Sequence, residues 1–553
     1  MRLGTSYKQR PIEGTFDTIV IGSGIGGLTA AALLANEANE RVLVLERHYT
    51  AGGFTHTFTR KGYEWDVGVH YVGEVLNPRS DVRGVFDAIS DGKLQWADMG
   101  EVYDTIIFGE DRYELRAGAD NFIEQMVRYF PEERQAIETY VARVKKTVAK
   151  GRLFFAEKAM PSAIGALFGR LMRARVLGEA RRTTAEVLEE LTDNKRLRAV
   201  LAGQFGDYGL APREASFFIH AMVVNHYLEG GAYPVGGSAQ IAATILPVIE
   251  RAGGAVFTNA EVDEILIEGN RAVGVRMVDG REIRAPRVIS GAGVHTTFDR
   301  LIPAEVADRH GLRDRGRRIA PSIGHLSLYL GFEQTAEELG LGKSNLWVFP
   351  SDDHDDNVRQ MLADPDTAEL PAVYLSFPGA KDPDFTRRHP GKTTVEVVTL
   401  APYEAFAKWE TGKWKKRGPE YEALKARLSE RLLEALFQQC PQLRGKVAFQ
   451  ELSTPLTTRH FANFACGEIY GLEQTPLRFE QDWLRPRTPI QGLYLTGADI
   501  CSAGVAGAMF GGVLTVSALM WRDMVAVCAK RAKALRRRRP EADPQVGQKA
   551  DAA

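Results

Sequence analysis

Residues 16–46 read FDTIVIGSGIGGLTAAALLANEANERVLVLE and contain the pattern that decides the fold. Residues 16–21 form a short apolar run rich in β-branched side chains, which is typical of a buried parallel strand. Residues 28–35 are rich in alanine and leucine and predict a helix, and residues 41–46 return to a strand pattern. Strand, helix and strand in this order predict a Rossmann-type βαβ unit, and with it a protein of the α/β class.

Three glycines lie where the first strand meets the helix. Gly22, Gly24 and Gly27 fit the pattern G-x-G-x-x-G. In such a unit the first glycine permits a tight turn, the second lets the backbone approach a pyrophosphate, and the third allows close packing of helix on strand. Glu46 ends the second strand 19 residues after Gly27, where a carboxylate can accept hydrogen bonds from ribose hydroxyls. The stretch therefore predicts a dinucleotide site.

Two further segments indicate which dinucleotide is bound. ERHYTAGGFTHTF (46–58) places Arg47 beside the acid and the doublet Gly52–Gly53 shortly after it. GLYLTGADICSAGVAGAMFGG (492–512) is a second glycine-rich segment, near the C-terminus. These motifs resemble the flavoprotein superfamily of amine oxidases, phytoene desaturases and Rab escort proteins. The resemblance implies FAD as the cofactor and a glutathione-reductase-2-like, Rossmann-type FAD-binding domain with an interleaved α+β substrate domain.

The same resemblance implies roles for individual residues. The glycine doublet would lie along the pyrophosphate and ribityl chain, and Asp499 would hydrogen-bond the ribityl or pyrophosphate part. The helix start around Val505 and Ala508 would point at the pyrimidine edge of the flavin, where the helix dipole stabilises the anion of the reduced ring. Val262, in TNAEVDEI (258–265), matches the strand whose backbone meets the adenine.

A closer resemblance covers residues 16–524. GYEWDVGVHYVGEV (62–75) and STPLTTRHFANFACGEIYG (453–471) resemble the retinol saturases, with the carotenoid cis–trans isomerases as the next relatives. The resemblance implies an FAD-dependent oxidoreductase that acts on a carbon–carbon double bond of a long apolar isoprenoid or polyene substrate. Isomerisation or phytoene-type desaturation of a carotenoid stays open as an alternative, and so does non-catalytic binding of a prenylated partner.

Two side chains of the first segment are candidates for the chemistry. A reduction that delivers a hydride to one alkene carbon needs a proton for the other, and His70 or Tyr71 can supply it. The alternative is that both residues pack around the cofactor. SGAGVHTTF (290–298) lacks the third glycine of a second dinucleotide fingerprint, so the electron donor is open. The histidines show no ligand spacing, and we expect no metal site.

The succession of patterns divides the chain into six segments. We expect three parts of the FAD-binding domain at 14–120, 236–300 and 461–528, because strand and glycine patterns return there. Between them we expect a mostly helical substrate part at 121–235 and an antiparallel-sheet substrate domain at 301–460. Residues 529–553 read as a basic, partly disordered tail.

Composition excludes some classes of function. The formal net charge of −1 provides no basic field for a nucleic acid. Four scattered cysteines indicate reduced thiols, and the first fifteen residues contain no apolar segment of the kind found in signal peptides. We therefore expect a cytoplasmic protein.

Two basic and apolar elements suggest contact with the inner face of a membrane. Residues 159–178 contain no acidic side chain, and residues 530–539 carry seven cations. The alternatives are a helix docked on the protein's own core and a solvated tail. The uncharged stretch 500–521 has the composition of a membrane span, but its small residues favour a helix that lies against the cofactor.

Overall fold

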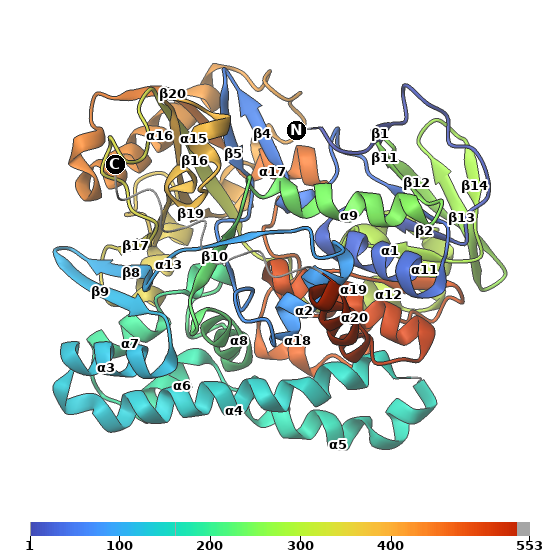
Figure 1. Ribbon diagram of the computed structural model, residues 1–553, viewed down its shortest axis with the longest axis horizontal. Coiled ribbons are helices and arrows are strands. Elements are labelled where there is room, and N and C mark those ends of the chain that lie inside the picture. The colour runs from blue at the N-terminus through green and yellow to red at the C-terminus, as the bar shows by residue number, and fades with distance from the viewer. Residues whose placement is uncertain (1, 161, 539–553) are drawn as a thin grey trace.

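The computed structural model describes residues 2–160 and 162–538, and a parallel sheet of six strands lies on one side of the molecule (Figure 1). Each neighbouring pair in this sheet is parallel. The spatial order is β1 (Thr5–Ser6), β11 (Ala255–Thr258), β3 (Val42–Leu45), β2 (Thr18–Ile21), β15 (Val288–Ser290) and β21 (Leu493–Leu495). The sheet confirms the predicted Rossmann-type α/β fold, and the chain returns to it from three separate regions.

Alternate side chains of the central strands point to opposite faces of this sheet. Val20, Val42 and Val44 belong to a core that includes the helices on one face. Ile19, Leu43 and Leu45 belong to a second core, shared with a small antiparallel sheet on the other face. Because both faces are covered, these strands are continuous apolar runs. The covering elements are helices α1 (Ile25–Ala38), α9 (Ala239–Arg251) and α19 (Gly504–Met520), and strands β12 (Val262–Glu268), β13 (Arg271–Met277) and β14 (Glu282–Arg284).

A sheet of seven strands forms the centre of the substrate domain. Its order is β20 (Val447–Ser453), β16 (Gly324–Phe332), β19 (Thr393–Ala401), β18 (Val373–Ser376), β17 (Asn345–Phe349), β8 (Val102–Phe108) and β9 (Asp111–Arg116). All pairs are antiparallel except β17 with β8. The sheet therefore differs from the predicted segments in one respect: β8 and β9 come from residues 102–116, which the sequence pattern assigns to the FAD-binding part.

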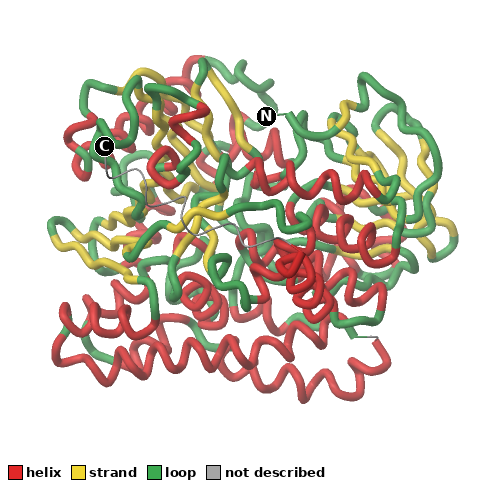
Figure 2. The backbone as a smooth tube through the Cα atoms, viewed as in Figure 1, coloured by secondary structure: helices red, strands yellow, loops and turns green. Residues whose placement is uncertain are grey.

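Helices line one edge of the molecule (Figure 2). They are α3 (Ala119–Tyr129), α4 (Arg134–Ala159), α5 (Ser162–Ala180), α6 (Thr184–Leu191) and α7 (Lys195–Ala202). Helix α8 (Phe217–Tyr227) packs against α4 on the inner side of this row (Figure 1). Their range agrees with the helical character predicted for 121–235. Much of the predicted membrane-facing helix depends on the side chains of residues 161–168 and of Arg170. These side chains lie outside the described part of the structure.

The predicted boundary at residue 528 falls inside a helix. Helix α20 (Met524–Arg538) follows α19 at a bend of 109° and packs on α2 (Asp81–Ile89). It buries Met524, Cys528 and Ala532, which are spaced four apart. Residues 529–538 are therefore part of the fold, and the predicted disordered tail after them lies outside the described residues. Among the described residues no single helix is long and apolar enough to cross a membrane, although α19 and α20 together pass that test by length and composition.

Smaller elements connect these layers. The remaining strands are β4 (Thr57–Arg60) and β5 (Tyr63–Asp66), which pair with each other, and β6 (Val72–Gly73), β10 (Gly231–Pro234) and β7 (Trp96–Asp98), which form a three-stranded sheet. The remaining helices are α10 (Val294–Thr296), α11 (Ala304–Arg309), α12 (Leu312–Gly316), α13 (His354–Ala363), α14 (Pro378–Lys381), α15 (Phe385–Arg388), α16 (Pro419–Gln439), α17 (Pro455–Ala462) and α18 (Pro476–Glu480).

Candidate functional site

The glycine turn after β2 borders an open space. Gly22 has a φ of 91°, which only glycine adopts readily, and so makes the tight turn out of the strand. Gly24 precedes α1 with a φ of −60°, and a Cβ atom on it would meet nothing within 4 Å. A Cβ on Gly27 would instead lie 2.3 Å from the carbonyl oxygen of Gly22. Gly27 thus lets the helix approach the strand, whereas Gly24 leaves room for an anion at the helix N-terminus.

The glycine doublet closes the other side of this turn. Gly52 forms an isolated parallel bridge with Gly24 and donates its N–H to the Ser23 hydroxyl at 3.0 Å. Gly53 has a φ of 56°, and a Cβ on it would lie 2.8 Å from the Cα of Gly24. The two glycine segments therefore touch backbone to backbone, and only glycine fits at this contact.

The acid at the end of β3 is buried and oriented. The Oε2 atom of Glu46 accepts hydrogen bonds from the N–H of Ser23 at 2.9 Å and from its hydroxyl at 2.7 Å. The Oε1 atom accepts from the N–H of His48 at 2.7 Å. A carboxylate can accept about four hydrogen bonds, so Glu46 keeps capacity for a ribose hydroxyl. That bond remains a prediction.

Arg47 and Val262 flank this acid. The Arg47 guanidinium is fixed by Glu261, with Nε and Oε1 3.2 Å apart, and donates to the carbonyl oxygen of His460 at 2.7 Å. Val262 begins β12 and is almost fully buried. Both residues line the same cavity as Glu46. The positions are consistent with an adenosine end here, and contact of Val262 with adenine stays a prediction.

The second glycine-rich segment lies on the opposite wall. Asp499 accepts the N–H of Leu472 at 2.9 Å and the N–H of Val294 at 2.7 Å, and so ties three distant segments together. The segment around Val294 is the incomplete glycine motif at 290–298, so this motif forms a wall of the same cavity. Gly497 has a φ of 93° and no atom within 4 Å of a Cβ placed on it. As at Gly24, this open space is room for a ligand.

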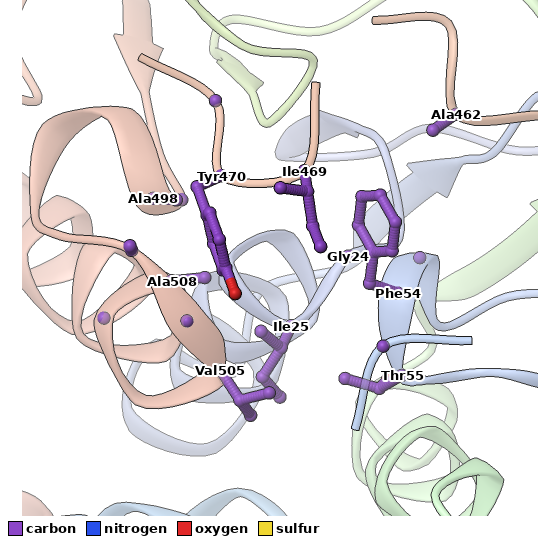
Figure 3. A pocket seen from close by; sticks show the side chains of 18 of the residues that line it. Gly24, Ile25, Phe54, Thr55, Ala462, Ile469, Tyr470, Ala498, Val505 and Ala508 are labelled. Carbon is purple, nitrogen blue, oxygen red and sulfur yellow. The ribbon is translucent and has the colours of Figure 1, made fainter. Parts of the chain in front are cut away.

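Helix α19 begins beside the glycine turn. Tyr470 and Ile469 project from one loop into the space that Ile25 and Val505 border, with Phe54 and Thr55 on its other side (Figure 3). The hydroxyl of Tyr470 donates to the carbonyl oxygen of Gly206 at 2.9 Å. Sequence analysis did not single out Tyr470. The sequence does contain one indication of its role, because Tyr470 stands next to Gly471 at the end of the segment 453–471.

One cavity of about 1320 Å³ joins these residues. Every predicted site residue except Gly52 lines it: Gly22, Gly24, Gly27, Glu46, Arg47, Gly53, His70, Tyr71, Val262, Asp499, Val505 and Ala508. The volume exceeds the range of about 300–1000 Å³ that is usual for one small ligand, so the cavity has room for a dinucleotide and a second molecule. The open spaces at Gly24 and Gly497, the helix N-termini and the buried acid fit FAD.

The part of the cavity beyond the glycines is apolar. Helix α8 presents Ile219, Met222, Val223 and His226 to it, at the i, i+3, i+4 and i+7 positions of one face. Phe155 of α4, whose ring stacks on Phe218 of α8, also lines this part of the cavity. His220 points the other way, into the core, where its ring nitrogens lie within hydrogen-bonding distance of two tyrosine hydroxyls. The arrangement suits a long apolar molecule.

His70 is poorly suited to be a cationic proton donor. Burial lowers the pKa of His70 to about 3, and the nearby Lys381 ammonium acts in the same direction. Its Nδ1 lies 2.8 Å from Oε2 of Glu396, but the two atoms are not aligned for a hydrogen bond. Burial also raises the pKa of Glu396 to about 8. The imidazole is therefore neutral at pH 7, and it packs against the ring of Tyr374.

Tyr71 lies in a different environment, between two carboxyl groups. Its hydroxyl is 2.8 Å from Oδ2 of Asp104 and 3.1 Å from Oδ2 of Asp207. Its ring stacks on Tyr227 with the centroids 4.0 Å apart. Burial raises the pKa of Tyr71 well above its usual value, and both acids add to that effect. Sequence analysis did not predict the two acids.

An FAD cradle continuous with a large apolar cavity defines a flavin-dependent oxidoreductase. A family model described as "Flavin containing amine oxidoreductase" matches residues 25–520. The chain therefore belongs to the flavin-containing amine oxidoreductase family, and its cofactor is FAD.

Comparison with individual proteins is consistent with this assignment. The chain is 37% identical to an all-trans-retinol 13,14-reductase from Danio rerio over 92% of its own length and 86% of that protein. It is 28% identical to a chloroplastic prolycopene isomerase from Arabidopsis thaliana, over 91% of the chain and 82% of that protein. Among solved structures, an oxidoreductase from Methanosarcina mazei superposes with a TM-score of 0.60 at 18% identity, over 92% of this chain and 100% of the other, and so shares the fold.

Proposed function

We propose that this protein reduces a carbon–carbon double bond of a long apolar isoprenoid or polyene substrate. The observation that carries the proposal is the continuity of the cavity, which runs from the FAD cradle at Gly24 and Gly497 to the apolar face of α8. A relative named all-trans-retinol 13,14-reductase, 37% identical over most of the chain, supports this reaction.

The walls of the cavity determine how such a substrate is held. The apolar side chains of α8 and α4 exclude water and bind a hydrocarbon chain along its length. Polar groups gather at the FAD end, where Tyr71 and Asp207 line the same space. A double bond drawn to that end meets the cofactor and the acids together, while the rest of the chain remains in apolar surroundings.

The test is anaerobic product analysis with purified protein whose FAD has been reduced with dithionite. All-trans-retinol and a panel of cis- and trans-carotenoids are offered, and products are analysed by mass spectrometry. A product two mass units heavier than its substrate is expected. A product of unchanged mass but altered retention would replace the proposal with isomerisation. A protein that stays colourless with added FAD would favour non-catalytic binding.

We further propose that the mouth of the cavity docks on an anionic membrane surface. Trp521, between α19 and α20, lines the cavity and is 64% exposed, and Leu153 of α4 lies on the same lining and is also exposed. Arg152, next to Leu153, pairs with Asp81 at the start of α2, on which α20 packs. Exposed cations of α20 lie from its middle to its C-terminal end: Lys530, Lys533, Arg537 and Arg538. An apolar rim with nearby cations supports uptake of substrate from anionic lipid.

Trp521→Asn tests the docking proposal. Trp521 has a φ of 56°, in the left-handed region that asparagine tolerates well, so this change removes the indole without disturbing the end of α19. We expect about tenfold weaker partition to anionic vesicles in a flotation assay, because burial of a large apolar side chain contributes about 1.5–3 kcal/mol. Leu362→Ser, at an exposed leucine of α13 away from the cavity lining, is the matched control. Wild-type protein that stays at the bottom of the gradient would remove the proposal.

A further inference from the structure

Two acids, the buried Asp104 and the partly buried Asp207, share the single hydroxyl of Tyr71 at the FAD end of the cavity. Asp104 is on β8, Asp207 ends a short 3-10 turn (Phe205–Asp207) that precedes α8, and Tyr71 directly follows His70. The hydroxyl has one proton, and two carboxyl oxygens lie within 3.1 Å of it. Only one of them can receive that proton, so the other contact requires a proton on a carboxyl group.

The surrounding hydrogen bonds decide which acid holds the extra proton. Lys381 donates to Oδ1 of Asn345, and because a lysine ammonium only donates, this contact fixes the orientation of the amide. The NH₂ group of Asn345 must then face Asp104, where it donates to Oδ1 at 2.9 Å. Gln204 donates to Oδ2 of Asp104 at 2.7 Å. Asp104 therefore has the donors that a charged carboxylate needs.

Asp207 lacks such donors. Tyr71 is the one side-chain partner of its carboxyl group among the described residues, and its open side faces the cavity. Burial, together with the charge of Asp104, raises the pKa of Asp207 well above its usual value. Burial also raises the pKa of Asp104, but the hydrogen bonds from Asn345, Tyr71 and Gln204 act against that rise. The extra proton therefore belongs on Asp207.

Asp207 also lies at the end of the cavity where FAD binds. Its neighbour Gly206 accepts the hydroxyl of Tyr470 at 2.9 Å, and the ring of Tyr470 stands in the space beside Ile25 and Val505 (Figure 3). These residues border the start of α1 and α19, where the FAD cradle is. A substrate double bond at that place would lie between the cofactor and Asp207.

We propose that Asp207 is kept as a neutral acid and gives its proton to the double bond, while Tyr71 and Asp104 hold it in place. The inference rests on the proposed reduction. When bound and reduced, FAD would be the source of the hydride, and so of both electrons, that one alkene carbon receives. The O–H bond of Asp207 breaks, a C–H bond forms at the other carbon, and Asp207 is left as a carboxylate that water reprotonates. Tyr71 then acts as a positioning residue, and His70 is not required as an acid.

The experiment compares wild type with Asp207→Asn and Asp104→Asn by infrared spectroscopy, without substrate. Burial raises the pKa of Glu396 to about 8, so its protonated carboxyl group contributes a carbonyl band at pH 7 in every variant. The wild type should show a further carbonyl band, from protonated Asp207, that is absent from the difference spectrum of Asp207→Asn. In Asp104→Asn the neighbouring negative charge is gone, so the Asp207 band should disappear at a lower pH than in the wild type. If Asp207 only supported the fold, replacing Asp104 would not change the pH at which this band disappears. An Asp207→Asn spectrum identical to that of the wild type would overturn the proposal.

Stability provides a second readout that does not depend on turnover. An acid whose pKa is raised in the folded state binds a proton there that the unfolded chain has lost, so its contribution to stability falls as pH rises above about 4. Asp207→Asn should therefore melt at a higher temperature than the wild type at pH 7, with a gap that narrows towards pH 4. A gap that does not change with pH would contradict the protonated state.

Turnover separates this proposal from the proposed function. With wild type active, Asp207→Asn should keep its FAD and lose about 10²–10⁴-fold in kcat, the usual contribution of a general acid. Full activity in that variant would exclude Asp207 as the acid. A wild type that saturates no polyene would instead count against the reduction, and the infrared band would still decide whether Asp207 is protonated.

Discussion

Gly24→Val should yield a folded protein that retains no FAD. A Cβ at this position meets no protein atom within 4 Å, and the backbone, with a φ of −60°, is open to any residue. The isopropyl group would therefore occupy only the space at the N-terminus of α1, where the pyrophosphate is expected. We expect the flavin absorbance to disappear from the purified protein, while the free energy of unfolding of the FAD-free form changes by no more than about 1 kcal/mol.

Gly27→Val is the matched control in the same motif. Its Cβ would lie 2.3 Å from the carbonyl oxygen of Gly22, a contact that backbone atoms cannot relieve without moving helix from strand. We expect a loss of about 3 kcal/mol or more in the free energy of unfolding, measured on the FAD-free form by urea denaturation. A yellow, fully loaded Gly24→Val protein would show that the pyrophosphate does not pass over this glycine.

The glycine turn could be predicted because its causes are local. Within residues 16–46 the strand, the turn, the helix and the acid follow one another at fixed spacing. Gly22 is required by its positive φ and Gly27 by its contact with the carbonyl oxygen of Gly22, while Gly24 leaves the open space for the ligand. The second glycine-rich segment could be predicted for the same reason, because its site residues Gly497 and Val505 lie within eight residues of each other. A sequence pattern is sufficient where the site consists of consecutive residues.

The acids around Tyr71 could not be predicted in this way. Asp104, Asp207, Asn345 and Lys381 come from four separate elements, and they meet because β8 enters the seven-stranded sheet beside β17. That strand pairing is parallel and joins residues more than 200 positions apart. No spacing or periodicity in the sequence encodes such a contact. The same unforeseen pairing is the reason that the FAD-binding part does not extend unbroken to residue 120.

The basic segment near the C-terminus shows a different limit. Its composition, with seven cations in ten residues, is typical of a solvated tail. In the structure Arg536 pairs with Asp87 at 2.8 Å and Arg531 with Asp91 at 3.1 Å, both acids near the end of α2. Charge composition does not show where the partners are, and here they lie more than 400 residues away. Because these two arginines pair with acids of the protein itself, only the other cations of the basic run can contact an anionic surface.

Val223→Trp should close the apolar part of the cavity without affecting the cofactor. Val223 lies on the face of α8 that lines the cavity, between Ile219 and His226, and it is not among the residues that border the glycine turns. The added indole would fill space that a hydrocarbon chain needs. Overfilling a packed site costs about 1–3 kcal/mol, so we expect polyene binding to weaken by about tenfold to 100-fold and turnover to fall with it.

The measurement combines FAD content, reduction of the bound flavin by dithionite and conversion of the polyene. Flavin absorbance and its reduction should match the wild type, because the cradle is unchanged, while KM for the polyene should rise. Val223→Ala enlarges the same space and should keep both FAD and conversion, which makes it the control for an effect of the position itself. If Val223→Trp converts the polyene as well as the wild type does, the substrate does not run along α8, and the apolar wall must be assigned to packing alone.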